Sequence, residues 1–325
     1  MGAGTLAFVA RRLGQGAVVV FAVATLVFVL LQAAPGDPLS IVEERISPEA
    51  LERLRRNFGL DRPVSEQYVR YITSLARGDL GVSLTQHRPV LDALAGAIPN
   101  TLLLAAAALL VDFALGLSIG IFQATRPGTR TDAALSALSI TLYSTPVFWL
   151  GLLLAVVFGQ GLGWFPVGGA TDPIAYASLS PAGRVLDRLH HLVLPALTLG
   201  LAAAGYTARH QRSALLEVMG QDFVRTARAK GLRERVVLLR HALRNALLPT
   251  ITLAGLAFPV LLSGSVLVES VFSWPGMGRL AAEAIGRRDY PLVTGAALLA
   301  AVMVVLGSLL ADLAARAADP RLRRA

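Results

Sequence analysis

Few residues in this sequence have the types and spacing that chemistry requires. A phosphate-binding loop needs Gly-Lys-Ser/Thr so that its lysine can reach the phosphates, but Lys230, the only lysine, lies between Ala229 and Gly231. The adjacent residues His190 and His191 would point to different faces of a helix, so they cannot chelate one metal ion from there. The sequence has no cysteine, no His-Glu-x-x-His and no Gly-x-Ser-x-Gly. We therefore expect no catalytic residue, no metal site and no ATP hydrolysis by this chain.

The composition is that of a membrane protein. Of the 325 residues, 54% are hydrophobic and only 16% are charged, and the mean hydropathy is +0.60. A soluble domain has about 25% charged residues, so a soluble enzyme, a disordered chain and a nucleic-acid binder are all excluded. The net charge of +9 comes from 30 basic residues, of which 29 are arginine. On an apolar chain such an excess indicates orientation in a lipid bilayer.

Six apolar stretches are candidates for membrane-spanning helices, which need about 20 residues each. They cover approximately residues 13–34, 101–124, 133–158, 192–208, 246–268 and 292–314. With both termini in the cytoplasm, the inner segments carry 17 basic and five acidic residues, a net of +12. The outer segments then carry 13 basic and 14 acidic residues. This is the positive-inside distribution, and it predicts two cytoplasmic termini.

Two segments between the spans are too long to be simple connections. Residues 35–98 are expected outside and partly helical, because Ser47-Pro48-Glu49 is typical of a helix start. Tyr68 and Tyr71 belong to an amphipathic stretch that follows. Residues 209–245 are expected inside, are strongly basic and are also expected to be helical.

The stretch from Asp222 to Gly231 predicts a short, separate helix. Asp222 can cap or complement its N-terminus, Lys230 suits its last turn, and Gly231 can adopt the left-handed conformation that ends a helix. Phe223 and Ala227 would share one face. A small face with one aromatic anchor suits either the groove of another protein or an anionic lipid surface. The residues alone leave both interpretations open.

Resemblance to a known family favours the protein groove over the lipid surface, and several motifs carry this resemblance. Residues 225–232 (RTARAKGL) and 241–249 (HALRNALLP) resemble the cytoplasmic EAA loop of ABC-importer permeases, in particular the dipeptide/oligopeptide/nickel branch. The sequence has Arg225 where the superfamily pattern has glutamate, and Pro249 lies farther from Gly231, as in the peptide branch. Further matching motifs extend over nearly the whole chain, at 35–38, 59–63, 78–83, 99–101, 269–280 and 288–291.

The resemblance implies an all-α type I ABC importer transmembrane fold in a bacterial plasma (inner) membrane. Its parts would be residues 1–98, with the first span and the external segment, a transmembrane domain at 99–318 and a cytoplasmic tail at 319–325. The implied partners are a second permease, two ATPase subunits or a fused ATPase, and an extracytoplasmic solute-binding protein. The chain itself would hold no cofactor, because ATP and Mg²⁺ would bind to the ATPases. The implied ATPase-coupling helix comprises Asp222, Phe223, Arg225, Thr226, Ala227, Arg228, Ala229, Lys230 and Gly231.

The solute would pass between two permeases, and polar or kinking residues in the spans are candidates for the wall of that passage. They are Tyr143, Ser144, Thr145, Pro146, Ser263 and Ser265. The alternative is that they pack helices or satisfy backbone groups near prolines. Asp112, alone inside a span, is more typical of helix packing than of a proton relay. The expected solute is a di- or oligopeptide, with nickel or another small solute as the alternative and an ion-coupled carrier as a distant one.

Overall fold

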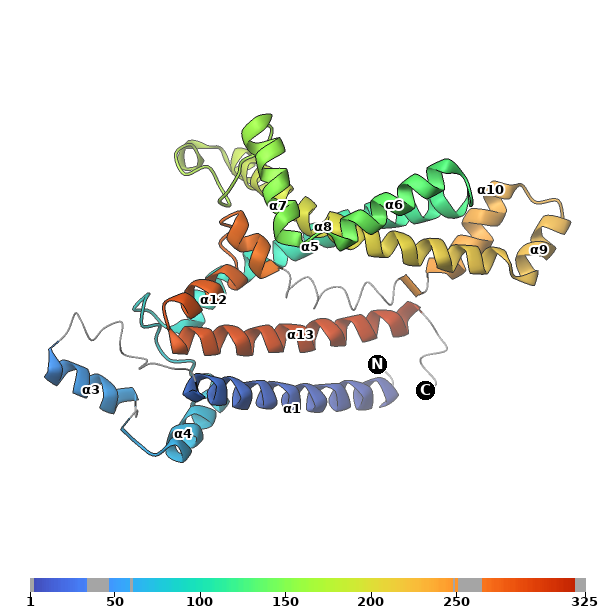
Figure 1. The fold of residues 1–325 in the computed structure, drawn as a ribbon. Coiled ribbons are helices and arrows are strands. Elements are labelled where there is room, and N and C mark those ends of the chain that lie inside the picture. Colours follow the sequence, from blue (N-terminus) through green and yellow to red (C-terminus); the bar gives the residue numbers. More distant parts are fainter. Residues whose placement is uncertain (1–2, 34–46, 59–60, 248, 251–264, 319–325) are drawn as a thin grey trace. The chain divides into compact units, whose positions relative to one another are not determined.

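The computed structural model describes residues 3–33, 47–58, 61–247, 249–250 and 265–318 (Figure 1). Within these ranges the regular structure is helical, apart from an isolated antiparallel bridge between Val82 and Pro89. The chain divides into two compact units, one of residues 1–100 and 276–305 and the other of residues 101–275 and 306–325. Helices α5 (Val90–Ala124) and α13 (Tyr290–Ala318) contribute to both units. The predicted all-α class is therefore confirmed for the described residues.

Four helices are long and apolar enough to cross a membrane: Leu6–Ala33, Val90–Ala124, Pro181–Met219 and Tyr290–Leu313. A bent pair, Arg130–Ser144 with Val147–Gly161, makes a fifth if it counts as one span. The predicted span at 246–268 lies mostly outside the described residues. Six spans and two cytoplasmic termini therefore stay predictions.

In the first unit, part of the segment predicted to lie outside packs against the first long helix. Helix α3 (Pro48–Phe58) begins at the predicted proline, and α4 (Val64–Ala76) contains the predicted amphipathic stretch. The hydroxyl groups of Tyr68 and Thr25 lie 2.8 Å apart, and Tyr71 stacks on Phe28 with ring centroids 5.4 Å apart. Thr25 and Phe28 belong to α1 (Ala3–Ala33), so these rings fix α4 to that helix.

A buried carboxylate holds another part of the first unit together. Asp289, between α12 (Met277–Gly286) and α13, accepts hydrogen bonds from the hydroxyl groups of Ser83 and Thr85 at 2.5 and 2.7 Å. Burial raises the pKa of Asp289, but these bonds and backbone bonds outweigh that effect and leave the pKa below its ordinary value. The carboxylate thus stays charged and ties residues 83–85 to the start of α13.

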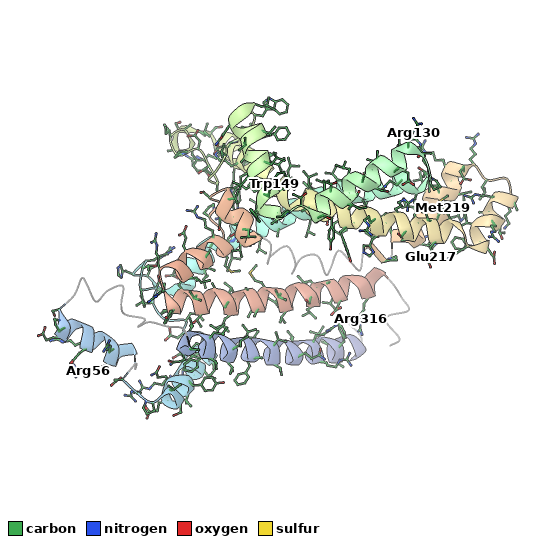
Figure 2. The ribbon with its side chains drawn as sticks, in the orientation of Figure 1. Arg56, Arg130, Trp149, Glu217, Met219 and Arg316 are labelled. Carbon is green, nitrogen blue, oxygen red and sulfur yellow. The ribbon has the colours of Figure 1, made fainter. Side chains whose placement is uncertain are left out.

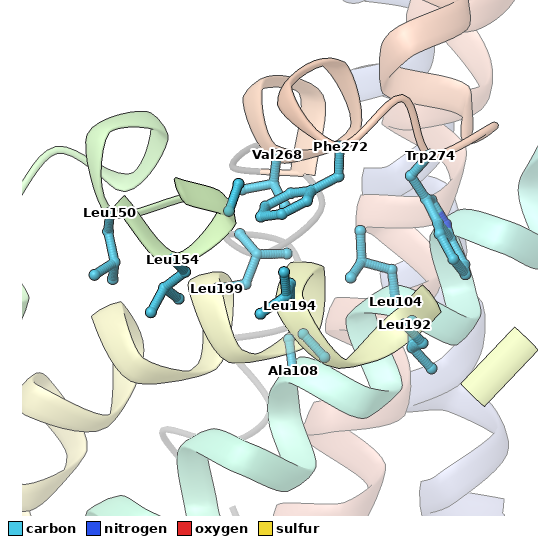
Figure 3. Close-up of a cluster of buried hydrophobic side chains, with 12 residues drawn as sticks. Leu104, Ala108, Leu150, Leu154, Leu192, Leu194, Leu199, Val268, Phe272 and Trp274 are labelled. Atoms are coloured by element: carbon cyan, nitrogen blue, oxygen red, sulfur yellow. The ribbon is translucent and has the colours of Figure 1, made fainter. Parts of the chain in front are cut away.

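In the second unit, α8 (Pro181–Met219) is the central helix (Figure 1). It packs against α6 (Arg130–Ser144) and α7 (Val147–Leu154), and the latter continues into the π-helix η1 (Ala155–Gly161). A short 3-10 helix, η2 (Tyr176–Ser178), precedes α8. Figure 3 shows the hydrophobic core that α8 shares with α5, α7 and residues 268–274. Its members include Leu104, Ala108, Leu150, Leu154, Leu192, Leu194, Leu199, Val268, Phe272 and Trp274.

Two predicted spans differ from the observed helices. Helix α8 has 39 residues, or about 58 Å, because Ser180 caps it and Pro181 starts it well before the apolar centre at 192–208. The predicted span at 133–158 is broken, since α6 and the α7–η1 segment meet at 105°. Pro146 has no N–H to donate and disfavours helical backbone at Thr145, whose ψ is 128°.

Glycines allow α5 and α8 to approach closely, and Gly116 and Gly120 have the Gly-x-x-x-Gly spacing that is typical of such helix contacts. A Cβ added at Gly116 would lie 2.7 Å from Thr207 Cβ, and one added at Gly120 would lie 2.6 Å from the Ala208 carbonyl oxygen. On the other side of α8, a Cβ at Gly205 would collide with the carbonyl oxygen of Ser139 in α6. At Gly120 and Gly205 the nearest contacts are with backbone, which cannot move aside as a flexible side chain can.

We expect opposite effects from two Gly→Ala replacements in helices. Gly205→Ala forces α6 and α8 apart and should destabilise the protein by about 1–3 kcal/mol, as overpacking does. Gly96→Ala adds a methyl group to α5 where no atom lies within 4 Å, and it should stabilise by about 0.5–1 kcal/mol through helix propensity. Thermal unfolding of the purified variants measures both, and an equal shift for the two would contradict the close approach.

Candidate functional site

The predicted short helix is present as α9 (Asp222–Ala229). Gln221 occupies the position before it without a side-chain cap, and the Asp222 carboxylate lies in the first turn, where it complements the helix dipole. Lys230 follows the last helical residue, and Gly231 has φ +73°. The predicted end of the helix is confirmed. Gly231 adopts the left-handed conformation that ends the helix. Glycine suits this position because the conformation is strained for residues with a Cβ.

One face of α9 packs on the chain itself. Val224 is fully buried and Ala227 is 6% exposed, and both belong to a cluster with Leu215 of α8 and Ala124 of α5. Ala227 therefore packs against this chain and does not share the exposed side with Phe223. The three-residue spacing of Val224 and Ala227 is the signal in the sequence that indicates this inner face.

The opposite side of α9 is open. Phe223 is 40% exposed at one edge of this side. The remaining exposed residues are the predicted ones: Asp222, Arg225, Thr226, Arg228, Ala229 and Lys230. Most of the predicted coupling residues thus share an exposed surface, which carries one large apolar side chain and several charges. We call this surface the α9 outer face.

An ion pair fixes the turn that follows α9. Arg228 donates to Glu234 through Nη2 at 2.6 Å and through Nε at 3.1 Å. The hydrogen bonds from Arg228 lower the pKa of Glu234. Glu234 starts the short helix α10 (Glu234–Val236), which leads into the π-helix η3 (Val237–Ala242). Because the pair is exposed, it orients the turn more than it stabilises the protein.

A partly buried ion pair anchors the end of α8 from which α9 continues. Arg212 of α8 donates to both carboxylate oxygens of Asp132 in α6, at 2.9 and 2.8 Å. Asp132 is 4% exposed and also accepts from the Gly128 backbone N–H at 3.0 Å, while the Gln123 amide lies 3.2 Å from its carbonyl oxygen. Figure 2 shows this end of the unit, with Arg130 on α6 and Glu217 and Met219 on α8. No local sequence signal indicates this pair, because its two residues lie 80 positions apart.

The passage candidates fall into three groups. Tyr143, Ser144, Thr145 and Pro146 lie together at the bend between α6 and α7, and Tyr143 is 54% exposed. Ser265 is fully buried, which favours the alternative that it packs helices. Ser263 lies outside the described residues. Tyr206 of α8, which the sequence analysis did not select, stacks on Tyr143 with ring centroids 5.9 Å apart.

In the rest of the described chain, buried or clustered ionisable groups give no further site. Asp112 is 1% exposed and lies in α5, as expected for helix packing. His190 Nε2 lies 2.8 Å from the Trp164 carbonyl oxygen, and His191 Nδ1 lies 2.9 Å from that of Asp187. Among the residues that the structure describes, no group of three His, Asp or Glu side chains could hold a metal ion.

Comparisons with known proteins give the family. Residues 116–324 match the model for the binding-protein-dependent transport system inner membrane component, and residues 5–105 match the model for its N-terminal part. The chain is 41% identical to the di/tripeptide transport system permease protein DppB of Pseudomonas aeruginosa, covering 98% of this chain and 99% of that protein. It is 37% identical to the oligopeptide permease AppB of Bacillus subtilis, with 97% and 99% covered. It is 38% identical to the glutathione permease GsiC of Salmonella paratyphi A, with 93% and 94% covered.

Solved structures share the fold at lower identity. A chain of the MetNI methionine ABC transporter in an inward-facing form has a TM-score of 0.53 and 21% identity, covering 70% of this chain and 97% of that one. A chain of an amino acid ABC transporter gives 0.52 and 18%, covering 70% and 94%. The fold is therefore that of ABC importer transmembrane subunits. The chain belongs to the family of binding-protein-dependent transport system inner membrane components, and it is a multi-pass membrane subunit of an ABC importer rather than an enzyme.

Proposed function

We propose that this chain forms half of the passage of an ABC importer for di- and oligopeptides. The observation that carries the proposal is the full-length similarity to permeases whose names specify di- and tripeptides, oligopeptides and glutathione, itself a tripeptide. The proposed partners are a second homologous permease, two ATPase subunits or a fused ATPase, and an extracytoplasmic binding protein. ATP and Mg²⁺ would bind to the ATPases. Nickel or another small solute is the alternative cargo.

The proposed topology is that of the sequence analysis. Six spans, with both termini in the cytoplasm, would put residues 209–245 on the same side as the ATPases. The proposed division is residues 1–98, 99–318 and 319–325. The charge distribution supports this orientation, since the segments assigned to the cytoplasm carry a net charge of +12.

The α9 outer face is the proposed contact with the ATPase. It is supported by the exposure of Phe223, a large apolar residue that a groove of a partner protein would cover. Closure of an ATPase pair would draw two such helices together. Because α9 packs against α8 and α5 through Val224 and Ala227, its movement would carry these helices with it. The proposed wall of the passage includes Tyr143, Ser144, Thr145 and Pro146, together with Ser263 and Ser265.

Purification of the tagged chain, expressed together with the proposed partner subunits, tests the proposal. We expect an ATPase to purify with the wild-type chain, and Phe223→Ala should weaken its retention. The control is Leu186→Ala, which shortens a 70% exposed side chain near the other end of α8. The reconstituted complex should take up di- or tripeptides when ATP is supplied. Uptake that is independent of ATP but depends on a proton gradient would contradict the proposal. Uptake of nickel without peptides would show that the alternative solute is the correct one.

A further inference from the structure

Three rings form a continuous exposed row across α6 and α8. Tyr143 of α6 and Tyr206 of α8 stack at 5.9 Å with an interplanar angle of 30°, and the ring centroids of Tyr206 and His210 are 4.2 Å apart. Tyr143 is 54% exposed, Tyr206 is 41% exposed, and His210 is exposed too. We call Tyr143, Tyr206 and His210 the ring row.

The backbone geometry brings these rings to one side of the unit. Gly205 lets α8 approach α6 so closely that an added Cβ would collide with the Ser139 carbonyl oxygen and lie 3.2 Å from the Tyr143 nitrogen. The adjacent Tyr206 therefore emerges next to Tyr143. His210 follows one helical turn later on the same side of α8. The row is thus fixed by a backbone contact and not by the rings alone.

The depth of Tyr206 can be read from its neighbours. Thr207 contacts Gly116 of α5, and Gly116 lies eight residues before the end of that helix at Ala124. At 1.5 Å per residue, this level is about 12 Å from the helix end. Leu115, next to Gly116, and Phe122, nearer the helix end, are exposed apolar side chains of α5. The phenol group of Tyr206 is therefore level with a helix portion that suits hydrocarbon.

Polar groups at this depth normally face a bundle interior or a water-filled space rather than lipid. The exposed side of α8 stays polar beyond the ring row, with Ser213 and Glu217 following at helical spacing. By contrast, α5 exposes Leu110 at 73%. The exposed surfaces of α5 and α8 therefore differ in chemistry. The bend at Ser144–Pro146 directly follows Tyr143, the member of the ring row that belongs to α6.

We infer that the ring row is a binding surface for the transported solute, and that it takes a peptide with a free, protonated amino group. The inference rests on the proposed function. Faces of tyrosine rings attract an ammonium group and stack with apolar side chains. The phenol and imidazole groups can exchange hydrogen bonds with peptide N–H and C=O groups. The contacts with the ammonium group and with the peptide backbone do not depend on the side chains of a peptide, so one surface serves many sequences.

The absence of cysteine from the chain makes a direct test possible. Single cysteines replace Tyr206, His210 and, as a matched control, Leu110 in the reconstituted complex with its ATPases. A membrane-impermeant, positively charged methanethiosulfonate then probes each thiol. We expect Tyr206→Cys and His210→Cys to react on the order of tenfold faster than Leu110→Cys, because only a hydrated thiol ionises and reacts. A saturating dipeptide should slow the first two reactions and leave the control unchanged.

A second pair of variants separates solute binding from packing. Tyr206→Phe keeps the ring and should keep most uptake, whereas Tyr206→Ala should raise the KM for a dipeptide by about 2–30-fold, the range of a cation–π contact. If Tyr206→Cys is as unreactive as Leu110→Cys, or if Tyr206→Ala loses the second permease instead of raising KM, the ring row is a packing surface and the inference is wrong. Retention of the ATPase in those samples shows that the proposed function itself has not failed.

Discussion

Gly231→Val is expected to abolish most ATP-driven uptake while the ATPase subunits still hydrolyse ATP. Gly231 has φ +73° in the turn after α9, and a Cβ there would meet no atom within 4 Å. The effect is therefore conformational rather than steric. The left-handed conformation costs an ordinary residue about 1–2 kcal/mol, and a β-branched side chain is a stronger outlier there. Valine should thus shift the turn toward other conformations and displace α9 from its place against α8.

A series of replacements at Gly231 tests whether the backbone conformation is the cause of the expected loss of uptake. Asparagine tolerates the left-handed conformation, so uptake should fall in the order Gly231, Asn, Ala and Val. Gly78 provides a matched control, because it follows α4 as Gly231 follows α9, with φ +77° and no atom within 4 Å of an added Cβ. Gly78→Val carries the same strain in a different turn, so it should leave ATPase retention unchanged.

The measurements are uptake per ATP hydrolysed and the amount of ATPase that remains with the purified complex. Both should decrease along the Gly231 series, whereas only overall stability should respond to Gly78→Val. If Gly231→Val transports normally, α9 does not transmit the action of the ATPase, and that part of the proposal has to be abandoned.

The ends of α9 were predictable because local chemistry determines them. Asp222 suits the first turn of any helix, and Gly231 suits the end of any helix, whatever surrounds it. Which side faces the protein was not predictable in this way. Ala227 was assigned to the partner because it is small, yet Leu215 and Ala124, far away in the sequence, cover it. Burial depends on those tertiary neighbours.

The spans show the same division between local and distant causes. The apolar centres of α1, α5, α8 and α13 were recognisable from hydropathy, but their lengths were not. The polar turns from Pro181 to Asp187 lengthen α8 beyond its apolar centre. The Ser180 cap stabilises the start of these turns. The bend at Pro146 had a local signal, because a proline disfavours helical backbone at the residue before it. The prediction of a single span at 133–158 did not take this into account.

The ion pair of Asp132 and Arg212 had no local signal at all. The two residues are 80 positions apart, and in the sequence they contribute only to the charge of two different loops. Their contact makes the start of α6 and the end of α8 one body. Since α9 follows α8 directly and the bend at Pro146 follows α6, the pair connects the α9 outer face to the bend.

Breaking this pair is expected to uncouple uptake even where the protein still folds. Arg212→Lys keeps the charge but loses the planar fork that binds both carboxylate oxygens. We expect uptake per ATP to fall by about tenfold, because one of two charge-assisted hydrogen bonds is lost. Asp132→Asn should be worse, since it leaves the guanidinium group of Arg212 without a charged partner in a partly buried place.

Two comparisons separate positioning from stability. Arg228→Lys breaks the same kind of forked pair with Glu234, but on an exposed turn, so it should hardly change the unfolding temperature. The exchange Asp132→Arg with Arg212→Asp restores opposite charges while removing the acceptor that the Gly128 N–H needs. It should recover part of the abundance lost in the single variants without recovering uptake per ATP. A purely stabilising ion pair requires only that the two charges attract. If abundance and uptake per ATP recover together in the exchange variant, the pair therefore stabilises the fold and does not transmit movement.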